Sequence, residues 1–411
     1  MAQRNWSKNV DFKDREFLQP CSLAELQTII NTHKNVRARG TAHCFNEIAN
    51  TSSYAINLSK MPKVIEINES KKSVTVASAL KYGDLAPVLH REGWALDNLA
   101  SLPHISIAGS VSTGTHGSGI KNQNLANQVL SIDMITAEGE LRHIDRSNPA
   151  FPALVVGLGL GGIVYQYELK TEPAFSIRQV IFPQMPMDIL RRNFDQIMGT
   201  AYSVSYFTDW GPEQTGNLWC KFRDEETIPE SIGGVISADK KYHPIPTVDP
   251  VACTEQFGLP GEWFQRLPHF KLDFTPSVGE EIQSEFFIDR KDAAEAIETI
   301  SRLAREITPI LWITEFRTIA ADEFWLSGAY QRDTFAIHFT WKKDDAIYPV
   351  IKKIENALRP LNYRPHWGKV FTADAEYLRS VYPKMEEFKA LTKALDPTKK
   401  FENSYTRENL M

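Results

Sequence analysis

Apolar residues in the first part of the chain recur at both helical and strand spacing. Ser22 and Glu25 form a capping-box pattern with leucines and isoleucines following at helical spacing, which predicts a helix over 22–33. Asp84 is predicted to cap a second helix, with Pro87 tolerated in its first turn. Apolar runs separated by polar turns predict strands over 64–67, 74–77, 129–136, 140–144 and 163–170.

Beyond Glu172 the apolar runs become longer. They predict strands over 203–210, 217–223, 282–288, 309–318 and 334–341. Helical spacing is found in 292–306, in 344–358 and, near the end of the chain, in 377–395. The stretch 227–270 is rich in Pro and Gly and predicts long loops. Together these patterns predict an α+β protein of two lobes, the second of which is an antiparallel sheet covered by helices.

The composition is that of a globular protein without nucleic-acid or membrane partners. Of the 411 residues, 42% are apolar, and the net charge is −5 at pH 7, so the basic surface typical of proteins that bind nucleic acid or anionic membranes is lacking. No apolar run has the length of a transmembrane helix, and the beginning of the chain has no signal-peptide core. The four cysteines are scattered, so no metal site is expected. We therefore expect a cytoplasmic monomer.

A glycine pattern at 157–162 has the spacing of a dinucleotide fingerprint but the wrong surroundings. Gly157, Gly159 and Gly162 satisfy G-x-G-x-x-G, and that motif must follow a strand and open a helix. Here a helix-like segment precedes the glycines and the strand 163–170 follows them. The reversed order argues against a nicotinamide dehydrogenase and favours a tight turn or a close approach to a bound group.

Two further segments are rich in residues that suit a phosphate ligand. Ser101–Gly119 holds four glycines, five serines, two threonines and two histidines, and such a run presents many backbone N–H groups and hydroxyls. Its interspersed isoleucines and valine favour a segment packed inside the protein over a solvent loop. Residues 37–46 predict a strand that enters a glycine turn, which is a second candidate phosphate nest. A lone histidine is more often structural than functional, so His43 by itself does not indicate a functional site.

Three predicted strands each combine one polar face with one apolar face. Strand alternation places on the polar faces the pairs Gln283 with Glu285, Glu315 with Arg317, and His338 with Thr340. These faces either meet solvent, as antiparallel sheets allow, or form a wall that binds hydroxyl groups; the scarcity of lysine favours the wall. A tight segment that carries His366 and Lys369 is a further candidate, although an ordinary turn explains it equally well.

Taken in order, these segments resemble the vanillyl-alcohol-oxidase superfamily of flavoproteins, specifically the alditol (xylitol) oxidases and the neighbouring aldonolactone oxidoreductases. The resemblance rests on 40–46, 101–119, 157–162, Glu315-Phe-Arg317, His338 and 365–369. It implies an α+β, two-lobed FAD-binding fold of the PCMH (vanillyl-alcohol-oxidase) type with an antiparallel-sheet substrate (cap) domain. The implied division is an FAD-binding domain over 1–175, a substrate-binding domain over 176–375, and a tail, 376–411, that returns to the FAD-binding lobe.

The resemblance also implies residue roles. His43 matches the histidine joined to the flavin 8α-methyl group, and because no cysteine occurs between Ser101 and Gly119, a single covalent linkage is expected. The positions that match FAD contacts are Gly40, Thr41, Ala42, His43, Cys44, Phe45, Ser106, Gly109, Thr113, Gly114, Thr115, His116, Ile163 and His366. Those that match the polyol site are Ser101, Gln283, Glu315, Arg317, His338 and Lys369.

The implied activity is oxidation of the terminal C1 hydroxyl of a polyol, such as xylitol or sorbitol, to the aldose, with O2 reduced to H2O2. By resemblance, Arg317 and Lys369 hold the C1 hydroxyl, and Glu315 and His338 bind the C2 hydroxyl. One alternative is an aldonolactone oxidase or dehydrogenase. The sequence Ser-Leu-Pro-His-Ile-Ser at 101–106 and His338 favour the alditol oxidase over this alternative. The other alternative is a carbohydrate-binding protein with no redox role.

Overall fold

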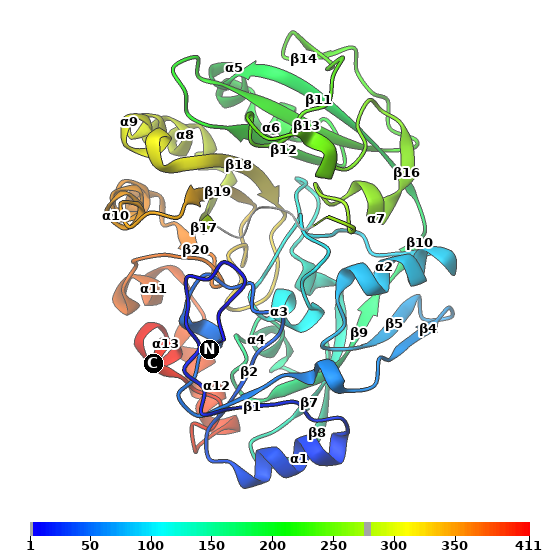
Figure 1. Cartoon of the computed structure of the whole chain (residues 1–411), viewed down its shortest axis with the longest axis vertical. Coiled ribbons are helices and arrows are strands. Elements are labelled where there is room, and N and C mark those ends of the chain that lie inside the picture. Colours follow the sequence, from blue (N-terminus) through cyan, green and yellow to red (C-terminus); the bar gives the residue numbers. More distant parts are fainter. Residues whose placement is uncertain (1–2, 275–280) are drawn as a thin grey trace.

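The computed structural model describes residues 3–274 and 281–411 (Figure 1). Its first part contains a parallel three-stranded sheet in the order β1-β3-β2 and an antiparallel five-stranded sheet in the order β4-β5-β9-β7-β8. The strands are β1 (Glu16–Leu18), β2 (Val36–Ala38), β3 (Tyr54–Ile56), β4 (Ile65–Asn68), β5 (Ser73–Ala77), β7 (Val129–Ile135), β8 (Leu141–Asp145) and β9 (Ile163–Lys170), with β6 (Trp94–Ala95) paired to β10 (Glu172–Pro173). The helices are α1 (Leu23–Thr32), α2 (Tyr82–Arg91), α3 (Ile107–Ser112) and α4 (Phe151–Val155).

The second part is built on one eight-stranded sheet in the order β16-β11-β13-β12-β18-β19-β17-β20. Its strands are β11 (Ser176–Pro186), β12 (Ser203–Thr208), β13 (Thr215–Arg223), β16 (Pro260–Glu262), β17 (Glu281–Asp289), β18 (Leu311–Ile319), β19 (Thr334–Lys342) and β20 (Arg364–Pro365); β14 (Ser231–Ile232) and β15 (Val235–Ile236) pair separately. The helices are α5 (Met187–Arg192), α6 (Phe194–Met198), α7 (Trp263–Arg266), α8 (Ala293–Ser301), α9 (Ala304–Ile307) and α10 (Ile347–Leu358).

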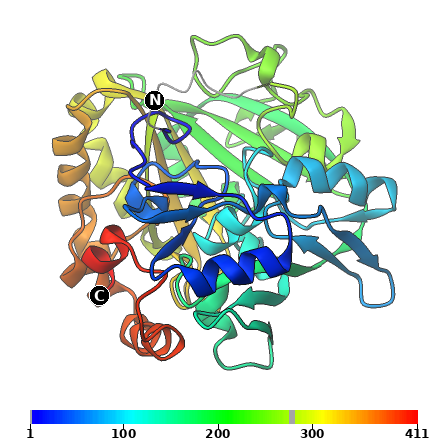
Figure 2. The ribbon, with the colours of Figure 1, turned by 60° about the horizontal axis from the view of Figure 1, so that its bottom comes forward.

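Short 3-10 turns connect many of these elements. They lie at η1 (Glu47–Ala49), η2 (Leu58–Lys60), η3 (Leu125–Gln128), η4 (Pro250–Ala252), η5 (Arg290–Asp292), η6 (Thr308–Ile310) and η7 (Arg359–Leu361). The chain ends with α11 (Ala375–Val381), α12 (Met385–Leu395) and α13 (Ser404–Asn409). Figure 2 shows the yellow, orange and red helices of the second half along one side of the molecule.

The large sheet has one apolar face, and helices cover it. Phe335, Ile337, Phe339 and Trp341 of β19 are fully buried in a cluster that includes Ile297 of α8 together with residues of α10. Burying such side chains contributes about 1.5–3 kcal/mol each to stability. Because neighbouring residues of a strand point to opposite faces, the polar residues of β19 must face the other way, toward the first part of the chain.

The C-terminal tail returns to the N-terminal sheets. The Lys400 carbonyl accepts a hydrogen bond from the Val36 N–H, and the Lys400 ammonium donates to the carbonyls of Ile30 and Ala137. Within the described residues no helix is long and apolar enough to cross a bilayer. The predicted domain limits, the cytoplasmic location and the monomeric state remain predictions.

Helix α2 begins earlier than predicted, because the loop beside it supplies the first hydrogen bonds. Its first residue is Tyr82, so Asp84 lies inside the first turn rather than at the cap, and Pro87 falls in the second turn. The N–H groups of Tyr82 and Gly83 donate to carbonyls at Ile105 and Pro103. A partner from a remote segment therefore replaces the local side-chain cap that the sequence predicts.

Other differences concern breaks and missed strands. The predicted helix 377–395 is split into α11 and α12 at Tyr382-Pro383, because proline cannot continue a helix. The stretch 292–306 forms two helices, α8 and α9. The stretch 227–270, predicted as loops, also contains β14, β15, β16 and α7, and the eleven-residue strand β11 was not predicted.

Candidate active site

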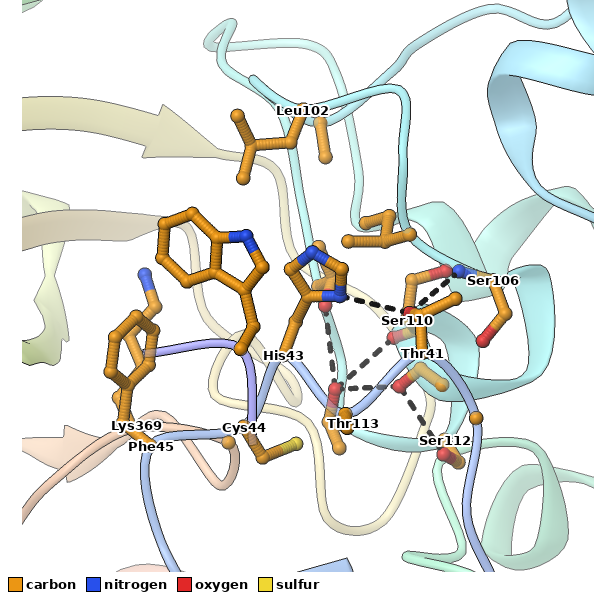
Figure 3. Close-up of a pocket in the computed structure, with 18 of the residues that line it drawn as sticks. Thr41, His43, Cys44, Phe45, Leu102, Ser106, Ser110, Ser112, Thr113 and Lys369 are labelled. Atoms are coloured by element: carbon orange, nitrogen blue, oxygen red, sulfur yellow. Dashed lines mark hydrogen bonds between the residues drawn. The ribbon is translucent and has the colours of Figure 1, made fainter. Parts of the chain in front are cut away.

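A cavity of about 810 Å³ lies between the glycine-rich segments of the first part and the polar face of the large sheet. It brings together nearly all the predicted site residues, from 40–45 and 101–116 to Ile163, His366 and Lys369. Gly114 is the exception: it lies in the turn that follows α3, with a φ of +68°, and does not line the cavity. Figure 3 shows the part of the wall around Thr41, His43 and Ser106.

Buried Arg37 fixes the floor of the cavity. Its guanidinium donates to the carbonyls of Ile48 (2.9 Å), Leu158 (2.7 Å), Gly159 (3.2 Å) and Phe401 (3.0 Å). Leu158 and Gly159 have positive φ values of 54° and 72°, which turn their carbonyls toward the arginine. The glycine pattern therefore forms a tight turn between α4 and β9, as its reversed order predicts. The Arg37 guanidinium that this turn binds places a positive charge beside the cavity.

The loop that follows β2 carries His43 on a tight turn. Ala42 has a φ of 58°, and Nδ1 of His43 lies 3.0 Å from Oγ1 of Thr41 (Figure 3). The Trp6 ring stacks on the imidazole with 5.6 Å between ring centroids. Burial, together with the charges of His104 and Lys81, lowers the pKa of His43 to about 4. The imidazole is thus neutral near neutral pH and available as a nucleophile.

The glycine-rich segment 101–119 folds partly into α3 and approaches this loop closely. A Cβ on Gly40 would lie 2.5 Å from Oγ of Ser106, so a side chain there would fill the gap between the two segments. The buried Oγ of Ser106 has no hydrogen-bond partner among the described residues. A narrow cradle of glycines with an unpaired buried hydroxyl fits a phosphate-bearing group such as that of FAD.

The polar face of the large sheet forms the opposite wall. In the register, His338 of β19 lies between Glu285 of β17 and Glu315 of β18. Glu285, Glu315, Arg317 and His338 are 1%, 4%, 7% and 6% exposed. Side chains that merely faced solvent would be far more exposed, so the interpretation as a solvent-facing surface is wrong, and a wall that binds hydroxyl groups stays the prediction.

Glu315 and Arg317 form the first of two buried acid–base pairs in this wall. One nitrogen of Arg317, Nη2, donates to Glu315 Oε2 and, over 2.7 Å, to Oγ of Ser101. Nε2 of His269 lies 2.9 Å from the other oxygen of Glu315. Burial would raise the pKa of Glu315, but Arg317 and His269 hold it well below its usual range. Nε of Arg317 has no partner in the described part of the chain, which leaves a donor for a ligand.

Lys369 and Glu285 form the second pair, with His338 beside it. Nζ of Lys369 is 2.5 Å from Oε2 of Glu285 and 2.6 Å from Nδ1 of His338. Burial would raise the pKa of Glu285, but Lys369 and His116 hold it well below its usual range. Burial and the charge of Lys369 lower the pKa of His338 to about 4, so its imidazole is neutral. Burial also lowers the pKa of Lys369, against the effect of Glu285.

Strand alternation with Gln283 predicts that Glu285 lies on the polar face of the candidate wall, although the resemblance does not include it among the polyol-site residues. His269 has no such signal in the sequence. His269 lies in the stretch predicted as loops and reaches Glu315 only through the tertiary fold. Within the described residues, no group of three or more His, Cys, Asp or Glu suits a metal ion.

Known protein families match both parts of the chain. The FAD binding domain family matches residues 16–145, and the D-arabinono-1,4-lactone oxidase family matches residues 278–409. The alditol oxidase of Streptomyces sp. (strain IKD472 / FERM P-14339) is 40% identical over 100% of this chain and 99% of its own length. The L-gulono-1,4-lactone dehydrogenase of Mycobacterium tuberculosis (strain ATCC 25618 / H37Rv) is 26% identical over 99% of this chain and 98% of its own.

Solved structures with a similar fold include a cholesterol oxidase from B. sterolicum, with a TM-score of 0.82. The match covers 100% of this chain and 96% of that one at 13% sequence identity. At such low identity the likeness concerns the fold alone.

Proposed function

The chain belongs to the alditol oxidase family of FAD-dependent oxidoreductases, and from this premise we propose that it oxidises the terminal C1 hydroxyl of a polyol such as xylitol or sorbitol. The alcohol loses two hydrogens to O2, which gives the aldose and H2O2. The observation that carries the proposal is the buried wall of two acid–base pairs that faces the glycine-rich cradle across one cavity.

We propose that the cradle holds FAD and that His43 is joined to it covalently. The contact set is the one the resemblance implies: residues 40–45, Ser106, Gly109, 113–116, Ile163 and His366. The cavity volume, the unpaired Ser106 hydroxyl and the neutral His43 imidazole support this placement. When bound, FAD would supply the acceptor for the hydride of the alcohol carbon and the route by which the electrons pass to O2.

The wall residues act on the polyol itself. Arg317 and Lys369 are placed to hold the C1 hydroxyl and to stabilise negative charge that develops on its oxygen, as fixed cations in a buried site do. Glu315 and His338 bind the C2 hydroxyl, and Ser101 and Gln283 align the rest of the chain. A flexible polyol has many rotamers, so fixing two adjacent hydroxyls lowers the entropic part of the barrier.

The first prediction tests this function directly. Purified protein is expected to be yellow, to lose its flavin absorbance when xylitol is added without oxygen, and to release H2O2 when air is readmitted. An aldonolactone such as galactono-lactone should reduce the flavin much more slowly, because ring closure through O4 ties up most of its carbon chain and leaves no extended polyol chain for Ser101 and Gln283 to align. Rapid reduction by the lactone and none by xylitol would favour the lactone oxidase. A colourless protein would contradict both.

The second prediction concerns the covalent linkage. His43→Ala should release its flavin into the supernatant on acid precipitation, whereas the wild type should precipitate yellow. Cys44→Ala is the matched control, since it removes the neighbouring nucleophile of the same loop, whose thiol has a pKa raised by burial to about 11. Flavin that still precipitates with His43→Ala would show that another residue carries the linkage.

A further inference from the structure

Glu285 is a buried carboxylate that the proposed reaction does not use. It lies at the centre of β17 and is 1% exposed, yet it lines the cavity. One oxygen contacts Lys369, and the other, Oε1, lies 3.1 Å from Nε2 of His116. Because His116 belongs to the glycine-rich segment 101–119, Glu285 connects the cradle with the polyol wall.

Lys369 is held to Glu285 by the backbone as well as by charge. The N–H of His366 donates to the Glu285 carbonyl over 3.0 Å, and the N–H of Val370 donates to the Gln283 carbonyl over 2.8 Å. The segment that carries Lys369 thus runs along the edge of β17. This alignment fixes which part of the strand the ammonium faces.

The contacts of Lys369 determine the tautomer of His338. An ammonium only donates hydrogen bonds, so Nδ1 of His338, 2.6 Å from Nζ, must carry a lone pair. The proton of the neutral ring is then on Nε2, which donates to Oγ1 of Thr340 over 3.1 Å. With two of its N–H groups directed at Glu285 and His338, Lys369 has one left for a substrate hydroxyl.

We propose that Glu285 is a positioning residue for the alcohol oxidation: its carboxylate holds the Lys369 ammonium against Nδ1 of His338, so that one tautomer of His338 and one N–H of Lys369 are presented to the substrate. This inference rests on the proposed function. Glu285 acts through Lys369 and His338 and is not itself a catalytic residue.

The charges around Lys369 give the direction of the expected pH effect. Burial and the charge of Arg317 on β18 lower the pKa of Lys369, whereas Glu285 above all, and Glu315, raise it. The rings of His338 and His366 are neutral and add no charge that would raise it. Loss of the Glu285 charge therefore lowers the pKa of Lys369 further. If protonated Lys369 is required, the rate falls as pH rises through that pKa, and the fall must occur at lower pH in a variant without the charge.

Glu285→Gln is the test, because it keeps the shape of the side chain and removes its charge. Reduction of the flavin by saturating xylitol, followed anaerobically in stopped flow across the neutral and alkaline range, should be slower by about 100-fold near neutral pH. The alkaline fall of the pH–rate profile should move down by about one to three pH units. The limiting rate should change more than the xylitol concentration that gives half of it.

Two variants and one prior measurement make the result decisive. Glu285→Asp should lie between wild type and Glu285→Gln in both rate and profile, and it carries the test if Glu285→Gln does not fold. Glu355→Gln, another buried carboxylate outside the cavity that accepts from the Thr372 N–H, should leave the profile unchanged. A uniform loss of rate with the wild-type profile would overturn the proposal. Wild-type flavin that xylitol does not reduce would instead refute the proposed function.

Discussion

Arg317→Ala is expected to slow reduction of the bound flavin by xylitol about a thousandfold, measured anaerobically in stopped flow. The substitution removes the fixed cation proposed to stabilise negative charge on the C1 oxygen, a contribution worth about 10²–10³ in rate when one such donor is lost. It also leaves Glu315, 4% exposed, with His269 as its remaining partner in the described structure. A buried carboxylate without its cation is unfavourable, so the side chains of the wall are also expected to shift from their positions.

Two comparisons separate the loss of the cation from general damage. Arg317→Lys keeps the charge but lacks the planar guanidinium, whose Nη2 contacts Glu315 and Ser101 and whose Nε has no partner in the described residues, so its rate should lie between those of wild type and Arg317→Ala. Arg223→Ala breaks an ion pair with Glu172 on a strand away from the cavity, and should alter stability while the reduction rate stays within about twofold of wild type. A near-normal rate in Arg317→Ala would remove this residue from the site.

The predicted α+β, two-lobed FAD-binding fold with an antiparallel sheet is confirmed, and its polar wall was visible in the sequence because strand alternation is a local property. Glu315 and Arg317 share a face in any regular strand that contains them. The register is not local. The local sequence does not predict that His338 lies opposite both Glu285 and Glu315, because pairing of β19 with β17 and β18 depends on how the whole sheet packs.

The early start of α2 and the place of His269 share one cause, which is that their partners come from distant segments. Carbonyls at Ile105 and Pro103 accept the first hydrogen bonds of α2, which begins three residues before the position that a cap at Asp84 predicts. His269 enters the site from a stretch whose Pro and Gly content indicates loops. The Ser22 hydroxyl caps α1 as predicted, but the carboxylate of Glu25 accepts from the Cys21 N–H rather than completing the box with Ser22.

The wall combines charges in a way that a solvent-facing sheet would not. Two acid–base pairs flank a neutral histidine, and the carboxylates of both pairs are buried. Taking ions out of water costs free energy that their mutual attraction only partly offsets, so such an arrangement contributes little to stability. Its value lies in function, since fixed charges in a dry cavity need no reorganisation when charge develops on a substrate.

Lys369→Met is expected to have the second large effect, on stability as well as on rate. Methionine has a similar length and no charge, so Glu285 would remain buried without its cation. Breaking one partner of a buried pair costs about 3–5 kcal/mol, which thermal unfolding of the flavin-loaded protein should report as a lower Tm. Loss of the N–H proposed to hold the C1 oxygen should reduce the flavin-reduction rate by about 10²–10³.

The double variant Lys369→Met with Glu285→Gln distinguishes these two effects. Replacing both charges removes the buried carboxylate that the single variant leaves unpaired, so Tm should recover toward that of the wild type. The reduction rate should not recover, because the catalytic donor is still absent. If rate and Tm were restored together, Lys369 would contribute to activity only by stabilising the fold, and the C1 hydroxyl would have to be held by Arg317 alone. If neither recovered, Glu285 and Lys369 would not behave as a coupled pair, and the second half of the proposed wall would have to be abandoned.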